Sequence, residues 1–246
     1  MQSSRVEEAF EVVVGGAGTC PVLLTCEHAS NRVPPPRVWP DEDRWLAPLH
    51  WAYDLGAAAI TRQLAEDLGA VAVLARFTRL LVDPNRVLSS DTLFREVADG
   101  KTVHLNTEAS PAEREARIST FYEPFHGAID HAMEGREPGL LLSIHSFTPR
   151  YEGGALRPME MGVLFDRNRD DALRLAAAFS RQGLKTALNA PYSGMNGMMY
   201  SAQSHADRHG WRALELEIRQ DLSGDPTQVK RLSQAIAVAL AAIQEV

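Results

Sequence analysis

The sequence predicts an α/β fold with a mixed, largely parallel sheet flanked by helices. Short apolar segments alternate along the chain with segments whose apolar residues recur at helical spacing. Some of the apolar segments contain no polar position, which is typical of strands buried on both faces of a sheet. No internal repeat or break in composition divides the 246 residues. We therefore expect one α/β domain that covers residues 1–246.

The expected strands are apolar, or alternate apolar with polar residues, and cover 9–14, 22–26, 71–75, 79–83, 140–144, 161–165 and 214–218. The alternation in the last of them predicts one polar face. Helices are expected at 53–68, 110–133, 170–182 and 227–244. The second helix begins with a capping box, Ser110-Pro111-Ala112-Glu113, with proline at the first helical position. Residues 88–108 show no period and predict a long excursion or lid.

The composition narrows the range of partners. A net charge of −7 and a pI near 5.6 leave no broad cationic surface for nucleic acid. The start of the chain lacks the apolar core of a signal peptide, and no apolar run approaches the roughly 20 residues that cross a bilayer. We expect a cytoplasmic protein without a membrane segment, with Cys20 and Cys26 as reduced thiols. Nothing in the sequence indicates the oligomeric state.

Two of the expected strands end on a histidine. The apolar run 22–26 leads into Glu27 and His28, and the run 140–144 leads into His145. In an open α/β sheet, ligands bind at the carboxyl ends of the strands, so these two histidines can share one crevice. Imidazole nitrogen is a preferred ligand of zinc, which in catalytic sites binds three protein groups and water. The pattern therefore predicts a metal site that needs a third ligand.

Two carboxylates are candidates for the third ligand. Asp54 stands at the start of an expected helix, and Glu27 precedes His28. A helix cap would also explain Asp54, and a solvated strand end would also explain Glu27. The residues alone leave this choice open.

Other polar groups follow or line the expected strands. Arg79 and the run 83–86, which ends in Asn85 and Arg86, could bind a substrate carboxylate, because the planar guanidinium group matches that geometry. On the polar face of the strand 214–218, a glutamate in an enclosed site could transfer a proton. The loop 189–194 carries Tyr192, whose hydroxyl could close over a ligand. Surface arginines, a solvated strand face and an ordinary turn are the alternative interpretations.

The remaining histidines that we considered, His104, His126, His131, His205 and His209, do not follow strands. We assign them no metal role. His205 and His209 are four residues apart, so they would share one face if this segment is helical.

These motifs, taken in order, resemble the N-formylglutamate amidohydrolase family. The resemblance covers roughly residues 20–220 and rests on Cys-Glu-His-Ala-Ser-Asn-Arg-Val-Pro from residue 26, an aspartate ahead of a helix, Asp-Pro-Asn-Arg at 83–86, Ile-His-Ser at 144–146, the loop 189–194 and Leu-Glu-Ile at 216–218. The family looks related to zinc carboxypeptidases and aspartoacylase-type deacylases, which implies a zinc-exopeptidase-like fold with zinc at the strand ends.

The resemblance implies a role for each matched residue. His28 and His145 become zinc ligands, and Asp83 becomes the group that orients a ligand. Arg79, Asn85 and Arg86 become the groups that bind the carboxylate of the substrate and polarise the carbonyl of its amide. Glu217 becomes the general base and acid.

The sequence departs from the carboxypeptidase pattern His-x-x-Glu at one informative position. Three residues after His28 stands Asn31, so the third ligand must lie elsewhere. We favour Asp54 over Glu27, because typical members of the family have a non-acidic residue before the histidine. The acidic residue there also indicates a divergent branch.

The implied activity is zinc-dependent hydrolysis of the amide of a small, acidic N-acyl amino acid such as N-formylglutamate, releasing the acyl acid and the amino acid. Two alternatives remain open at this point. One is a metallo-peptidase or deacylase that acts on another acidic amide, and the other is a non-catalytic module that binds a carboxylated metabolite.

Overall fold

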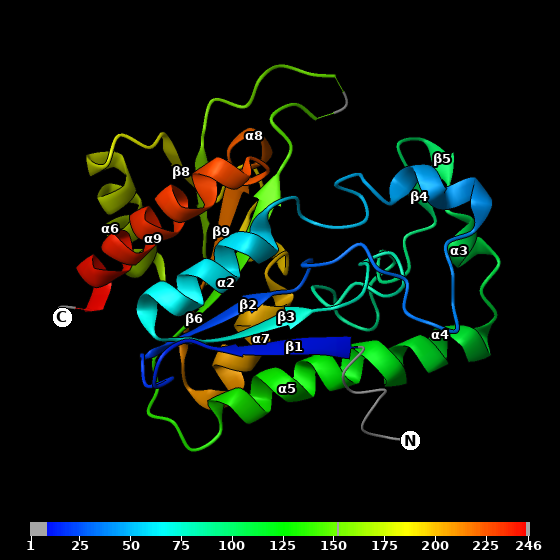
Figure 1. Ribbon diagram of the computed structural model, residues 1–246, viewed down its shortest axis with the longest axis horizontal. Coiled ribbons are helices and arrows are strands. Elements are labelled where there is room, and N and C mark those ends of the chain that lie inside the picture. The colour runs from blue at the N-terminus through cyan, green and yellow to red at the C-terminus, as the bar shows by residue number, and fades with distance from the viewer. Residues whose placement is uncertain (1–8, 152, 245–246) are drawn as a thin grey trace.

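The computed structural model describes residues 9–151 and 153–244, and its main element is a seven-stranded sheet. The strands lie in the order β1-β3-β2-β6-β9-β7-β8 (Figure 1). Their bounds are β1 Phe10–Val14, β2 Val22–Cys26, β3 Val71–Ala75, β6 Leu140–Phe147, β7 Met161–Leu164, β8 Thr186–Leu188 and β9 Arg212–Arg219. The strands β3, β2, β6 and β9 pair in parallel, whereas β1 runs antiparallel to β3 and β7 antiparallel to β9. The expected mixed, largely parallel sheet is confirmed.

Helices cover both faces of the sheet. On one face α2 (Ala57–Leu68), α6 (Arg169–Arg181) and α9 (Val229–Gln244) pack against the strands and against each other. On the other face lie α5 (Glu123–Met133) and α7 (Tyr200–His209). The sheet is therefore the middle layer of three, with an apolar core on each side.

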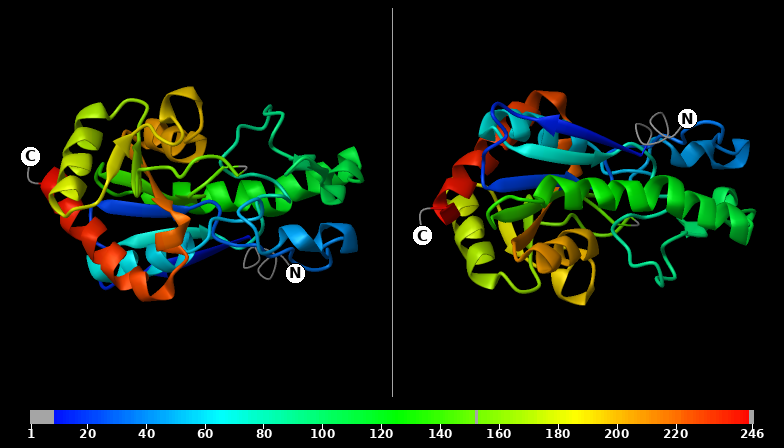
Figure 2. Two further views of the ribbon diagram at one scale, coloured as in Figure 1. Left: turned by 90° about the horizontal axis from the view of Figure 1, so that it is seen from above. Right: turned by 90° about the horizontal axis from the view of Figure 1, so that it is seen from below.

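The shorter elements include α3 (His104–Thr107), α4 (Pro111–Arg117), α8 (Gln220–Ser223), and η1, η3 and η4, at Asp41–Leu46, Gly194–Asn196 and Pro226–Gln228. Both views in Figure 2 place α4 and η1 at the end of the molecule opposite α9. The described residues contain no helix that is long and apolar enough to cross a membrane.

The alternation of side chains along the central strands decides which residues reach the site. In β2, β6 and β9, one set of alternate residues, such as Leu24, Ile144 and Leu216, is buried in the core beneath α2, α6 and α9. The residues of the other set point to the face covered by α5 and α7, and those near the carboxyl ends of the strands are polar. His145 and Glu217 belong to this set and are neighbours in the register of β6 and β9. The polar face expected for 214–218 exists, but it is buried rather than solvated.

Three expectations need correction. Residues 79–83 form no strand: the amide of Leu81 bonds to the carbonyl of Thr78 in a turn, and the amide of Asp83 bonds to Leu93, so these apolar residues fill the core without joining the sheet. The helix expected from 53 begins at Ala57, because Gly56 has a left-handed backbone. The helix at 110–133 is present, with Ser110 as its cap, but a π-turn, η2 (Ile118–Tyr122), interrupts it.

The segment 88–108 is an excursion with some structure of its own. It contains the short hairpin of β4 (Val97–Ala98) and β5 (Lys101–Thr102), followed by α3. Buried side chains attach it to the rest of the fold. The carboxylate of Asp43 accepts hydrogen bonds from the amides of His104 and Leu105, and Asn106 donates to the carbonyls of Leu80 and Arg95.

Candidate active site

The carboxyl ends of the central strands open into a polar pocket of about 240 Å³. Its walls include residues that follow β2 and β3, the end of β6, the polar face of β9 and the loop after β8. The eight residues that we assigned to metal binding, catalysis or substrate binding line it: His28, Asp54, Arg79, Asn85, Arg86, His145, Tyr192 and Glu217. The parallel strands thus bring together side chains that are up to 189 positions apart in the sequence (Glu217 minus His28).

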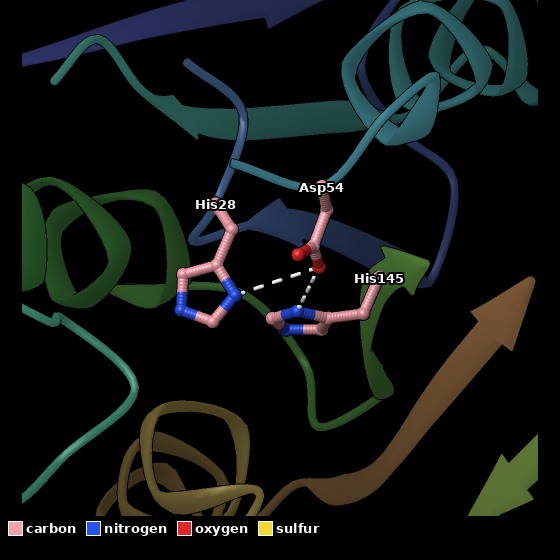
Figure 3. Close-up of side chains that lie close together, drawn as sticks. All are labelled: His28, Asp54 and His145. Carbon is pink, nitrogen blue, oxygen red and sulfur yellow. Dashed lines mark hydrogen bonds and ion pairs between the residues drawn. The ribbon is translucent and has the colours of Figure 1, made fainter. Parts of the chain in front are cut away.

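Two histidines and one aspartate converge on a single point (Figure 3). One oxygen of Asp54, Oδ2, lies 2.8 Å from Nδ1 of His145 and 3.4 Å from Nδ1 of His28. All three side chains are buried, with relative exposures of 2–4%. Among the described residues, this is the group of three or more potential ligands whose atoms lie close enough together to hold a metal ion.

The outer nitrogen of each histidine faces another carboxylate. Nε2 of His28 lies 2.8 Å from Oδ1 of Asp83, and Nε2 of His145 lies 3.1 Å from Oε2 of Glu27. These partners favour the proton on Nε2, so the lone pairs of both Nδ1 atoms face Asp54. Nδ1 of His28 is buried and has no hydrogen-bond partner. Two lone pairs and a carboxylate oxygen at this spacing can bind a cation placed between them, and these residues therefore fit a metal cation.

The backbone holds Asp54 in place. Its amide donates to the carbonyl of His28, and its Oδ2 also accepts from the amide of Ser146. Two residues later, Gly56 packs directly on the carbonyl of Ser223, where an added Cβ would lie 1.7 Å from the oxygen. Gly56 is the N-cap of α2, and no side chain, including that of Asp54, caps this helix. Burial raises its pKa, but the neighbouring His28 and His145 outweigh that effect and lower it.

Glu27, the rival third ligand, occupies a different position. It is fully buried and accepts hydrogen bonds from Ser143 and from the outer nitrogen of His145. Although burial raises its pKa, these bonds hold it down at about 2. Glu27 therefore contacts the side of His145 that faces away from Asp54, a position that suits an orienting group better than a ligand.

Two further carboxylates lie on the buried face of β9. Glu215 Oε2 is 3.5 Å from Nε2 of His145 and accepts a hydrogen bond from Asn85. Glu217 lines the pocket, and its Oε2 is buried without a partner. Burial and the carboxylates of Asp54 and Glu215 raise the pKa of Glu217 well above its ordinary value, although His145 opposes them. A carboxyl group with a raised pKa can both accept and donate a proton near neutral pH.

Gly162 allows this strand face to form. It lies opposite Glu217 in the register of β7 and β9. A Cβ at this position would stand 2.2 Å from the carbonyl oxygen of Ala190 and 3.1 Å from Cβ of Glu217. The loop that carries Tyr192 can therefore cross close to the proposed proton carrier only because residue 162 lacks a side chain.

The segment after β3 supplies the arginines. Arg79 donates two hydrogen bonds to Oδ2 of Asp83, and its Nη1 lies 3.8 Å from Oδ1 of Asp54. Arg86 donates to the hydroxyl of Thr92 and to the carbonyl of Asn85, and among the described residues no carboxylate pairs with it. Arg79 is therefore held beside the proposed metal position, whereas the charge of Arg86 is not neutralised.

The amide of Asn85 is occupied within the protein. Its Nδ2 donates to the carbonyl of Met198 and to Glu215, and its Oδ1 accepts from the amide of Ser201. The side chain thus attaches the Asp-Pro-Asn-Arg segment to α7. Its predicted contact with substrate stays a prediction.

A model of the N-formylglutamate amidohydrolase family matches residues 20–223 of this sequence. The chain belongs to this family. The match covers every residue assigned a role above.

Similar proteins agree with this assignment. The N-formylglutamate deformylase of Pseudomonas aeruginosa is 28% identical, with coverage of 85% of this chain and 84% of that protein. A crystal structure of a gene product from Agrobacterium tumefaciens is 31% identical, with a TM-score of 0.88 and coverage of 98% of both chains. The structure of N-formylglutamate amidohydrolase from Ralstonia eutropha JMP134 shares the fold, with 19% identity, a TM-score of 0.73 and coverage of 97% of this chain and 100% of the other.

In this family member, the pocket also contains residues that sequence patterns do not single out. His50, Trp51, Arg95 and Arg157 line it, and all four come from segments between regular elements. The guanidinium group of Arg157 stacks on Tyr192, 5.5 Å from the ring centroid. No periodic pattern marks such positions. The one available signal was that 88–108, which carries Arg95, is an unusually long excursion.

The segment that carries His205 and His209 is helical, as their shared face requires. His205 and His209 share one face of α7, and both contact the carboxylate of Asp130 on α5. His205 also pairs with His126, with 2.8 Å between the two ring nitrogens. This second histidine cluster supports the contact of α5 with α7 and does not line the pocket. Cys26 is buried, which raises the pKa of its thiol to about 12 and excludes it as a thiolate nucleophile at neutral pH.

Proposed function

We propose that this family member is a metal-dependent amidohydrolase that cleaves the amide of a small, acidic N-acyl amino acid such as N-formylglutamate. The observation that carries the proposal is the convergence of two histidine Nδ1 atoms on one oxygen of Asp54, beside a buried carboxyl group and two arginines. The family and the names of its relatives support the choice of the formyl substrate.

His28, Asp54 and His145 would hold the metal, and zinc is the ion that this donor set suits best. A bound zinc ion supplies Lewis acidity and lowers the pKa of a water molecule toward neutrality. Asp83 and Glu27 fix the orientation of the two histidine rings through their outer nitrogens.

The other pocket residues would act on the substrate. Glu217 takes a proton from the attacking water and returns it to the leaving amine, which its raised pKa favours. Arg79 stabilises the negative charge that develops on the carbonyl oxygen, because Asp83 holds its guanidinium group beside the site. Arg86 binds the α-carboxylate of the amino acid, and Tyr192 covers the bound substrate.

Elemental analysis of the purified protein, followed by an assay of N-acyl amino acids, tests this function. We expect about one divalent metal ion per chain, and release of formate from N-formyl-L-glutamate that stops when a chelator removes the metal. N-acetyl-L-glutamate and an acidic dipeptide in the same assay distinguish a deformylase from a broader deacylase or peptidase. Bound metal without hydrolysis of any of these compounds would favour a binding module instead.

A further inference from the structure

Four arginines line the pocket, and they differ in how many of their hydrogen-bond donors are already used by other protein groups. Arg79 is paired with Asp83. Arg157 donates to the carbonyl and the hydroxyl of Thr148. Arg86 uses Nε and Nη1 for contacts with neutral groups. Arg95 contacts no carboxylate and donates no hydrogen bond to any residue in the described part of the chain, so its whole set of donors is available.

The position of Arg95 is nevertheless fixed. Its guanidinium group stacks on the indole ring of Trp51, 5.4 Å from the centroid. Its carbonyl accepts a hydrogen bond of 2.7 Å from Asn106, which is fully buried. Asn106 also bonds to Leu80 and accepts from Arg117, a buried arginine of α4. These buried hydrogen bonds thus fix the backbone of the excursion 88–108 where Arg95 lines the pocket.

The surroundings of Arg95 favour an anion. Burial, and the like charges of Arg79 and Arg86, lower its pKa, and Asp83 only partly opposes them. An anionic group bound here would relieve that repulsion and accept two hydrogen bonds from the planar guanidinium group. The geometry and the charges therefore suit the binding of an anion beside Arg95.

We infer that Arg95 is the specificity residue of this enzyme and binds a second carboxylate, at the end of the substrate's side chain, while Arg86 binds the α-carboxylate. The substrate is then a dicarboxylic N-acyl amino acid. This inference rests on the proposed function, because it assigns one end of the same substrate to a named residue. It also gives 88–108 a role: the excursion carries a recognition group.

A pair of substrates that differ only in the distal group isolates this contact. N-formyl-L-glutamate and N-formyl-L-glutamine have nearly the same shape, but only the first has a charge for Arg95. In the metal-loaded enzyme with Arg95→Gln, we expect kcat/KM for N-formyl-L-glutamate to fall by about 10- to 100-fold, mainly through KM, because one charge-assisted contact is lost. For N-formyl-L-glutamine, the same variant should change kcat/KM by less than about threefold.

Three further variants complete the test. Arg95→Lys keeps the charge and should recover part of the preference for the dicarboxylate. Arg86→Gln should weaken both substrates alike, since both have an α-carboxylate. Arg44→Gln removes an exposed arginine of η1, which pairs with Asp41 away from the pocket, and should leave the preference unchanged.

An equal loss for both substrates, or no loss for either, in Arg95→Gln would overturn the inference even if the enzyme is an active deformylase. If the unaltered protein hydrolyses neither compound, the proposed function fails. Titration calorimetry with the same two compounds then still decides the role of Arg95. Equal affinity for the two compounds, or no binding of N-formyl-L-glutamate, would reject this role. A preference for N-formyl-L-glutamate that Arg95→Gln abolishes would support it.

Discussion

The molecule contains two buried clusters of histidine and aspartate on the same side of the sheet, and they are built in opposite ways. In the pocket, Nδ1 atoms from His28 and His145 point at one oxygen of Asp54. Between α5 and α7, His205 and His209 also meet on one oxygen of Asp130, but Arg208 donates hydrogen bonds to the same carboxylate. The outer nitrogen of His205 bonds to His126. The second cluster therefore already contains a cation paired with its carboxylate, whereas the first does not.

The difference shows what distinguishes a metal site from a structural histidine cluster. Burial does not, because His205 is 1% exposed and His145 is 2% exposed. Proximity to a carboxylate does not either, because both histidines have one. The cation on the carboxylate does: Arg208 donates hydrogen bonds to Asp130, whereas Arg79 lies 3.8 Å from Asp54 and pairs with Asp83 instead. Within the described part of the chain, the potential ligand atoms of the pocket cluster lie within 4.8 Å of one another and form the candidate metal site. We therefore expect changes in the pocket cluster to alter metal binding and turnover, and changes in the α5–α7 cluster to alter stability alone.

Replacing His145 tests this contrast most severely. His145→Ala removes one Nδ1 ligand and the imidazole that Asp54, Glu27 and Glu215 all contact. We expect the variant to lose its bound metal and its hydrolytic turnover, as measured by elemental analysis and by formate release. The matched control is His205→Ala, an equally buried histidine of the other cluster, which should keep stoichiometric metal. Retained metal in His145→Ala would refute the site.

Glu217→Gln separates proton transfer from metal binding. Glutamine keeps the shape of the side chain but cannot carry a proton, and Glu217 contacts neither Nδ1 atom. We expect unchanged metal content, a KM close to that of the unaltered protein, and a kcat lower by about 10²- to 10⁴-fold. A kcat within threefold of the unaltered value would exclude Glu217 as the proton carrier.

The two candidates for the third ligand provide a finer test. Asp54→Asn removes the oxygen on which both nitrogens converge, so we expect metal affinity to fall by more than about 100-fold. Glu27→Gln removes a hydrogen-bond partner behind His145 and should cost about 10- to 100-fold. Competition with a fluorescent chelator measures both constants. The reverse order would make Glu27 the ligand.

Much of this site could be predicted from the sequence, because its central residues follow regular elements. His28 and His145 stand where buried apolar runs stop, and Glu217 stands on an alternating strand. Strand periodicity and the geometry of parallel sheets place such residues at one edge without any knowledge of contacts. The absence of glutamate at Asn31 also moved attention to Asp54, which lies beside the two histidines in the structure.

The rest depends on tertiary contacts that leave no local pattern. Residues 80–82 are as apolar as a strand, yet the amides of this segment bond to turns and loops and not to a neighbouring strand. Glu27 looks like a solvated strand end until its bonds to His145 and Ser143 are known. Arg95 owes its position to Asn106 and to stacking on Trp51, and neither contact has a sequence period.

The smallest effect that we expect is on the stability of the protein at acidic pH, and it comes from His126 in the cluster between α5 and α7. Burial and the neighbouring His205 lower the pKa of His126 from 6.5 to about 3. The unfolded chain therefore takes up the proton first as the pH falls, so this group lowers the free energy of unfolding below about pH 6.5, by about 2 kcal/mol at pH 5.

His126→Phe keeps an aromatic ring beside Tyr122 but removes the titration. Urea unfolding of both proteins at pH 7 and pH 5, with the same metal loading, measures the effect. The variant loses the hydrogen bond to His205, so we expect it to be less stable at pH 7 by about 1 kcal/mol. When the pH falls from 7 to 5, the free energy of unfolding of the variant should rise by about 2 kcal/mol relative to that of the unaltered protein. Since both proteins keep the pocket histidines, their titration cancels in the comparison. An identical pH dependence in the two proteins would mean that His126 is not held neutral by the fold.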